Sequence, residues 1–196
     1  KNHPQHLSVA AVLMNDKGEI CVHHLNQTNP LKGYWTDQGI IDAYLLMRET
    51  PEPGESLEQT LHRGLLEEFG ATAEIKDYIG SIQSHFKNEG VEIEKTTIYF
   101  LCSLKDQDLS KRSGDIESKT DLEWHTKEFL IPKMKEQSTK YGRTDVDESS
   151  ILEKLNYIFE SYVNHQGYQK SNADGVYHLF GFFIYRRTLE FLYNYK

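Results

Sequence analysis

The stretch from Pro53 to Ala71, PGESLEQTLHRGLLEEFGA, constrains the fold more than any other part of the chain. Its apolar residues recur every four positions and make one stripe along a helix: Leu57, Leu61, Leu65 and Phe69. Ser56 followed by Gln59 is a capping-box pair, and Gly70 is a helix stop signal. The sequence therefore predicts an amphipathic helix that begins at Leu57, packs one face on a core and presents charge on the other.

The charged residues Arg63, Glu67 and Glu68 lie off this stripe. Two adjacent carboxylates near the end of a helix oppose the helix dipole, which favours cations there. One interpretation is a solvated face on which Arg63 pairs with Glu67 one turn later. The other is a cation site, because Mg²⁺ takes oxygen ligands and needs only one or two protein carboxylates. The residues by themselves leave both interpretations open.

The same stretch resembles the Nudix box, the signature of the family that includes the MutT-type hydrolases. That signature is written G-x5-E-x7-R-E-U-x-E-E-x-G-U, where U is a bulky apolar residue, and Ala71 fits its last position only loosely. The positions that match are Glu55, Arg63, Leu65, Glu67, Glu68 and Gly70. The lead-in from Pro51 to Ser56 is also similar to that of many family members.

The box is degenerate at two positions. Glu49 stands where the opening glycine belongs, and Gly64 stands where the glutamate after the arginine belongs. A glycine inside a helix costs about 1 kcal/mol relative to alanine, so we expect a close approach by another segment or by substrate at position 64. Because one glutamate is lost and one is gained within the motif, Glu49 is the candidate to supply the missing carboxylate.

The resemblance implies an α/β fold, specifically an α/β/α sandwich with a mixed β-sheet. It implies a Mg²⁺-dependent hydrolase, with Mn²⁺ as a substitute ion, that cleaves a pyrophosphate bond in a nucleoside diphosphate linked to another moiety. By the same resemblance, the metal ligands are Glu67, Glu68 and the backbone carbonyl of Arg48. The catalytic set it implies is Glu49, Glu55, Arg63, Glu67 and Glu68. A weakened Nudix fold that binds nucleotides or has a regulatory role is the alternative, which Gly64 would explain directly.

Further candidates come from the surrounding loops. The Arg48 side chain either reaches a substrate phosphate or is a plain surface arginine. Tyr34 and Trp35 lie in the long polar stretch 26–42, where they either stack on a substrate base or anchor the loop. Family members often take an additional carboxylate from a later loop, and the candidates for it are Glu117, Asp121 and Glu123.

Composition excludes several classes of protein. The 196 residues carry a net charge of -8, so no strong nucleic-acid binding through a basic surface is expected. Cys21 and Cys102 sit in apolar, strand-like runs and are predicted to be buried reduced thiols. Nothing resembles a signal peptide, and no apolar run approaches the roughly 18 residues of a membrane span. We therefore expect a cytoplasmic protein that makes no membrane contact.

The remaining elements follow from strand and turn patterns. We expect one hairpin from 7–14 and 19–25, a strand at 43–47, a second hairpin from 73–86 and 91–104, a short strand at 121–124, and helices over 127–140 and 147–163. Pro132 should lie near an end of its helix or mark a kink. His23 and His24 are consecutive on a strand, so they face opposite sides and do not predict a two-histidine metal site.

The chain divides into a Nudix-like domain, 1–165, and an aromatic-rich C-terminal extension, 166–196. Aromatic and aliphatic residues in the extension recur at helix-like intervals: Tyr177, Phe180, Ile184, Phe191 and Tyr195. Ser171 to Ala173 resembles the remainder of a cleaved expression tag. The apolar side chains cannot stay exposed, so the extension is expected to pack on the domain or to form a homodimer contact.

Overall fold

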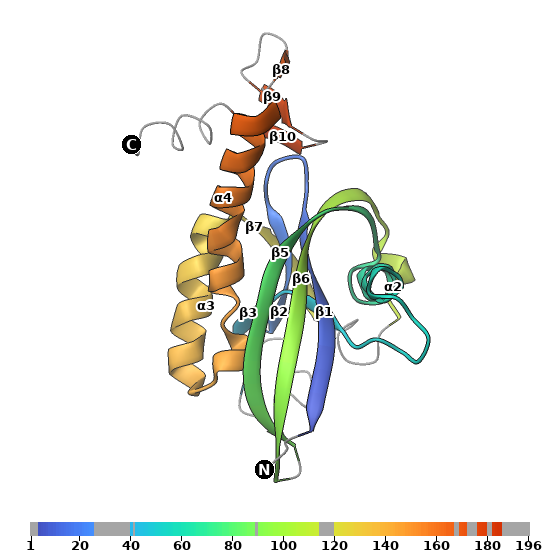
Figure 1. The fold of residues 1–196 in the computed structure, drawn as a ribbon, viewed down its shortest axis with the longest axis vertical. Coiled ribbons are helices and arrows are strands. Elements are labelled where there is room, and N and C mark those ends of the chain that lie inside the picture. The colour runs from blue at the N-terminus through green and yellow to red at the C-terminus, as the bar shows by residue number, and fades with distance from the viewer. Residues whose placement is uncertain are drawn as a thin grey trace.

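Figure 1 shows a computed structural model of the chain, which describes residues 4–25, 40, 42–88, 90–113, 120–166, 169–171, 176–179 and 182–185. Among these residues, seven strands form the main sheet and three α-helices flank it. The strands are β1 (Gln5–Met14), β2 (Ile20–Leu25), β3 (Ala43–Leu45), β4 (Met47–Glu49), β5 (Ala71–Asn88), β6 (Val91–Gln107) and β7 (Asp121–His125). The helices are α2 (Leu57–Phe69), α3 (Lys127–Tyr141) and α4 (Ser149–Gln166).

The sheet is mixed. Its main path runs β3-β2-β1-β6-β5, with β4 paired to β1 and β7 paired to β2. The neighbours β1 and β6 are parallel, whereas the hairpins β1-β2 and β5-β6 are antiparallel, as the turn signals predict. Strand β1 is therefore covered by partners on both edges and lies at the centre of the sheet.

Alternation along β1 builds a core on each face of the sheet. Val9, Ala11 and Leu13 belong to the core under α2, which also contains Leu61, Leu65 and Phe69. The residues between them, Ala10, Val12 and Met14, belong to the core under α3 and α4. Successive side chains of a strand point to opposite faces, so one strand serves both layers. Figure 1 shows α2 on one side of the sheet and α3 with α4 on the other, which confirms the α/β/α sandwich.

The predicted strand at 43–47 is two strands instead of one. Residues Ala43–Leu45 pair with β2, and Met47–Glu49 pair with β1. Between them, the backbone N–H of Leu46 donates a 2.8 Å hydrogen bond to a carboxylate oxygen of Glu148, at the start of α4. Because Glu148 is 1% exposed and takes this donor away from the ladder, the chain changes its strand partner at Leu46.

The other predicted elements are present with small shifts of their ends. Pro132 lies inside α3, not at its end. Cys21 and Cys102 are buried and free. None of the described helices is long and apolar enough to cross a membrane.

The described part of the C-terminal extension differs from the prediction. It forms the short strands β8 (Gln169–Ser171), β9 (Val176–Leu179) and β10 (Phe182–Tyr185), paired as a small antiparallel sheet. The helix-like intervals of Tyr177 and Ile184 therefore do not correspond to a helix, because both residues lie on strands whose backbones pair with each other. Phe180, Phe191 and Tyr195 lie outside the described residues, and the domain boundary at 165 stays a prediction.

Candidate active site on helix α2

Helix α2 begins and ends as its sequence predicts. The hydroxyl of Ser56 accepts a 3.1 Å hydrogen bond from the Gln59 amide, and the Gln59 side chain accepts one of 2.8 Å from the Ser56 amide. Gly70 ends the helix in the left-handed region with φ 61°. A Cβ on Gly70 would also lie 2.2 Å from the carbonyl oxygen of Asp108, so both the backbone angle and the neighbouring segment require glycine.

Arg63 joins the carboxylates of the box. Its Nε and Nη2 donate to the two oxygens of Glu55 at 2.8 and 2.9 Å, and Nη2 also donates to the carbonyl of Thr50. Its Nη1 lies 3.3 Å from Glu49 Oε2 and 3.5 Å from Glu67 Oε2. The hydrogen bonds from Arg63 hold the pKa of Glu55 at about 2. Arg63 thus fixes the loop before α2 and draws together carboxylates from two elements.

Gly64 permits strand β4 to lie directly on the helix. A Cβ at position 64 would lie 2.7 Å from the Cβ of Glu49 and 2.8 Å from Sδ of Met47. The close approach expected from the sequence is therefore made by another chain segment. As a consequence, the Glu49 side chain runs past the site of the lost glutamate to reach Arg63. Burial raises the pKa of Glu49, and the charge of Glu67 adds to the effect, against hydrogen bonds from Thr50 and Arg63.

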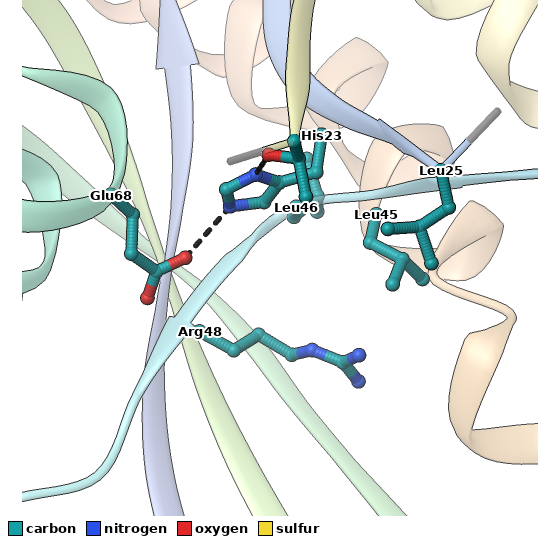
Figure 2. Close-up of a pocket in the computed structure, with 7 residues that line it drawn as sticks. His23, Leu25, Leu45, Leu46, Arg48 and Glu68 are labelled. Carbon is teal, nitrogen blue, oxygen red and sulfur yellow. Dashed lines mark hydrogen bonds and ion pairs between the residues drawn. The ribbon is translucent and has the colours of Figure 1, made fainter. Parts of the chain in front are cut away.

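Glu68 is buried, although its position off the apolar stripe suggests exposure. It is 5% exposed and follows Thr60 and Gly64 at four-residue intervals, which makes a second buried stripe beside the apolar one. Its Oε2 lies 2.7 Å from Nε2 of His23. The dashed line in Figure 2 marks this contact. Glu67, in contrast, has a side chain that is 36% exposed. The two adjacent glutamates thus have different surroundings.

The segment after β6 satisfies the end of α2. The last helical carbonyls have no partner within the helix. Here the carbonyl of Glu67 accepts from the Ser113 amide, that of Glu68 from Arg112 Nε at 2.5 Å, and that of Phe69 from the Gln107 side chain. The guanidinium of Arg112 also supplies the cation that the helix dipole favours at this end, which offsets the two adjacent glutamates.

His23 links the helix to the sheet and to the segment before β7. The ring is 4% exposed, and its Nδ1 lies 2.5 Å from the hydroxyl of Thr120. Burial and the nearby Arg112 and Arg48 cations lower the pKa of His23 well below its usual value. The sequence prediction did not include His23, Thr120 or Arg112. Alternation on β2 could have placed His23 on the same face as Cys21, toward α2, but no local signal marks Thr120 or Arg112.

Arg48 lies on the other face of the sheet from the α2 carboxylates. It pairs with Ala10, whose side chain belongs to the core under α3 and α4. Its Nη1 donates a 2.8 Å bond to the carbonyl of Asp145, and its Nε lies 3.8 Å from Glu148. In Figure 2 the guanidinium points away from Glu68. This side chain is no plain surface arginine, and its substrate and metal roles stay predictions.

A small cavity lies where the chain passes from β3, which pairs with β2, to β4, which pairs with β1. It measures about 40 Å³, room for a water molecule or two. Its lining is His23, Leu25, Leu45, Leu46, Arg48, Glu68 and Thr120 (Figure 2). Glu68 and Arg48, which lie on opposite faces of the sheet, both border this opening. The cavity therefore connects the charged end of α2 with the side of the sheet that α3 and α4 cover.

Two of the three candidates for an additional carboxylate, Asp121 and Glu123, lie in the described part of the chain. Asp121 and Glu123 pair with His24 and Val22, so their side chains lie on the α3 face, opposite α2. Glu123 accepts from Nδ1 of His24 at 2.7 Å and from Nε2 of His125 at 2.6 Å. The fold therefore separates both from the α2 carboxylates. Glu117, Tyr34 and Trp35 lie outside the described residues.

The carboxylates on α2 and β4 fit a hard divalent cation by donor type but do not form a finished cage. In the part of the chain that the structure describes, no group of three or more His, Cys, Asp or Glu side chains is arranged to hold a metal ion. Mg²⁺ commonly uses one or two carboxylates and completes its shell with water and substrate phosphate. Glu67, Glu68 and Glu49 carry oxygens of this type, and phosphate and water would complete the shell of a bound ion.

Comparisons with known proteins agree with this architecture. The NUDIX domain family matches residues 4–144. A NUDIX hydrolase from Nitrosomonas europaea is 18% identical, with a TM-score of 0.56 over 79% of this chain and 89% of that one. A C. elegans Ap4A hydrolase binary complex is 15% identical, with a TM-score of 0.52 over 80% of this chain and 99% of that one. At these identities the two structures show a shared fold.

A comparison with curated protein sequences gave no match. The family match nevertheless spans more than half of the chain and includes the whole of α2 with its Glu55, Arg63, Glu67 and Glu68. The chain belongs to the NUDIX domain family.

Proposed function

We propose that the protein is a Mg²⁺-dependent hydrolase, able to use Mn²⁺, that cleaves a pyrophosphate bond in a nucleoside diphosphate linked to another moiety. Members of the family generally hydrolyse such bonds. The observation that carries the proposal is the arrangement around Arg63, where Glu49, Glu55 and Glu67 all lie within 3.5 Å of the guanidinium, one turn from Glu68.

Each of these residues has a role in the proposal. Glu67 and Glu68 bind the cation through carboxylate oxygens, and the backbone carbonyl of Arg48 is the further candidate ligand. Arg63, held by Glu55, orients Glu67 and Glu49 by charge-assisted hydrogen bonds. Glu49 supplies the carboxylate that Gly64 lacks. The cation, when bound, would neutralise the phosphate oxygens that repel an attacking water and make bound water more acidic.

Three further expectations belong to the proposal. Tyr34, Trp35 and the Arg48 side chain are its candidate substrate contacts. The substrate is a small nucleotide derivative, and no strong nucleic-acid binding is expected from a chain of net charge -8. The proposal also includes a cytoplasmic location and a homodimer formed through the C-terminal extension. Measuring the oligomeric state of a chain that ends at Gln169 tests the homodimer.

The test is a panel of nucleoside diphosphate sugars, dinucleoside polyphosphates and nucleoside triphosphates, with release of nucleotide or phosphate measured with and without Mg²⁺. Turnover that requires the metal is the expected result. Binding of a nucleotide without turnover would instead support a weakened Nudix fold used for binding or regulation, which the glycine at position 64 favours. No binding and no turnover across the panel would contradict both.

A further inference from the structure

His23 is enclosed by two polar partners and one aromatic ring. Its Nε2 lies 2.7 Å from Glu68 Oε2, its Nδ1 lies 2.5 Å from the Thr120 hydroxyl, and its ring centroid lies 4.8 Å from that of Phe69. The imidazole therefore cannot rotate without breaking both hydrogen bonds. A buried ring held at both nitrogens is a fixed connector between its two partners.

Arg112 and Glu68 have fixed roles at the two ends of this chain of hydrogen bonds. A guanidinium can only donate, and Nη2 of Arg112 donates to the Thr120 hydroxyl at 3.1 Å. An ionised carboxylate can only accept, so Nε2 of His23 carries a hydrogen and donates it to Glu68. The Thr120 hydroxyl contacts the remaining ring nitrogen, Nδ1.

The chain closes on itself through the backbone of Glu68. Nε of the same Arg112 donates to the Glu68 carbonyl at 2.5 Å, and its Nη1 donates to the Thr120 carbonyl at 3.0 Å. Arg112, Thr120, His23 and Glu68 therefore form a closed ring that fixes both the main chain and the side chain of Glu68. The ring joins the end of α2, strand β2 and the segment leading into β7.

Glu68 and Glu67 are held by different kinds of donor. The guanidinium of Arg63 lies 3.5 Å from Glu67 and shares its positive charge with Glu49 and Glu55. The Glu68 carboxylate contacts Nε2 of His23 at 2.7 Å, and its backbone carbonyl accepts from the Arg112 guanidinium. These contacts fix the direction in which the Glu68 carboxylate points.

We propose that His23 and Thr120 are positioning residues that orient the Glu68 carboxylate for divalent-cation binding at the charged end of α2. The inference rests on the proposed function, because it concerns the cation that the hydrolase would use. Neither residue acts on the substrate itself. Donors that lie behind a metal ligand commonly change metal affinity by about 10- to 100-fold when they are removed.

The test measures binding of Mn²⁺ alone to the full chain by calorimetry, in four variants whose folding is checked by thermal unfolding. Thr120→Val removes the hydroxyl at nearly constant volume, and Thr120→Ser keeps it. His23→Leu removes both ring nitrogens, and His23→Gln retains a donor toward Glu68. We expect Thr120→Val and His23→Leu to weaken Mn²⁺ binding about 10-fold or more, and Thr120→Ser to stay within about 2-fold of the wild type.

The outcomes separate this inference from the function on which it rests. A wild-type chain that binds no Mn²⁺ would overturn the proposed metal dependence and this inference with it. Wild-type binding with unchanged affinity in folded Thr120→Val would overturn the inference alone. If His23→Leu fails to fold, Thr120→Val and His23→Gln still test the positioning role. A purely structural role would lower their melting temperatures and leave the Mn²⁺ affinity of the folded variants unchanged.

Discussion

Strand β2 presents neighbouring histidines to two different polar clusters. His23 faces α2, where it donates to the buried Glu68. His24 faces α3, where it lies 2.7 Å from Glu123 and 3.2 Å from Asp42 and stacks on the ring of Tyr44 at 4.4 Å. Both faces therefore hold a histidine and a carboxylate in contact, but the Glu123 oxygens are each taken by an imidazole, one from His24 and one from His125.

The two faces differ in how far the charge of their carboxylates is compensated by neighbouring side chains. On the α3 face, both carboxylate oxygens of Glu123 are hydrogen-bonded, one to His24 and one to His125. On the α2 face, Glu49, Glu67 and Glu68 come from two elements, and the cationic side chain that bridges two of them, Arg63, also serves Glu55. The α2 face therefore holds four carboxylates, Glu49, Glu55, Glu67 and Glu68, against the two guanidinium groups of Arg63 and Arg112, and a divalent cation would relieve this negative balance.

The sharpest way to break this comparison is to neutralise one glutamate on each face. Glu68→Gln removes a proposed metal ligand, so we expect Mg²⁺-dependent turnover to fall by roughly 100-fold or more, comparable to losing a major electrostatic group in an active site. Glu123→Gln should change turnover by less than about 2-fold, as expected of a group outside the reacting centre. Steady-state kinetics on the best substrate of the panel checks both. Equal losses of turnover in Glu68→Gln and Glu123→Gln would contradict the assignment of the site to the α2 face.

The second prediction concerns the packing that brings β4 onto α2. Gly64→Ala would improve helix propensity by about 1 kcal/mol at an unconstrained position. Here the new methyl group meets the Cβ of Glu49 at 2.7 Å, so we expect net destabilisation of about 1–3 kcal/mol from overpacking. Urea unfolding measures it. Glu58→Ala, at an exposed position of the same helix, is the control and should stay within about 0.5 kcal/mol.

A third prediction uses pH to examine Arg63 and its partner. The pKa of Glu55 is about 2 in the folded protein because Arg63 donates to it, which is below the value for an unfolded chain, about 4.3. The stability from this pair is therefore present above the unfolded pKa and is lost as pH falls from about 4.3 toward 2. Glu55→Gln should make acid unfolding less steep over that window. An unchanged acid-unfolding profile would contradict the assignment.

The smallest expected effect is on the α3 face. The rings of His24 and Tyr44 are nearly parallel, at 8°, and a double-mutant cycle of His24→Ala and Tyr44→Ala should give a coupling energy of about 0.5–1.5 kcal/mol. The measurement is urea unfolding of both single variants and the double variant. Turnover by His24→Ala should remain that of the wild type. A large loss of activity would move the functional site toward this face.

Much of α2 could be predicted because its determinants are local. The capping pair, the apolar stripe and Gly70 all lie within a few turns of one another, as do Arg63 and Glu67. The family resemblance added Glu55 to the predicted site, and the structure shows that it pairs with Arg63. The proximity of Glu49 to Gly64 followed as a hypothesis from two departures within one motif, and the structure supplies its physical basis in the contact between β4 and the helix.

The rest depends on which strands meet in space. The face on which Asp121 and Glu123 lie is set by the pairing of β7 with β2, across about a hundred residues of chain, and a shift of one residue would reverse it. The roles of Arg112 and Thr120 follow from the segment after β6 closing on the end of α2. The break at Leu46 depends on a carboxylate that comes from position 148. None of these has a signal in the local sequence.

The central claim is that the α2 and β4 carboxylates form one cation-dependent site in which Glu49 replaces the glutamate missing at position 64. The most direct test is kcat with saturating Mg²⁺ for Glu49→Gln beside Glu52→Gln, an exposed residue of the loop that follows β4. The account predicts a fall in kcat of roughly 100-fold for Glu49→Gln, as for other charge-stabilising groups, and little change for Glu52→Gln. Wild-type kcat in a folded Glu49→Gln variant would contradict it.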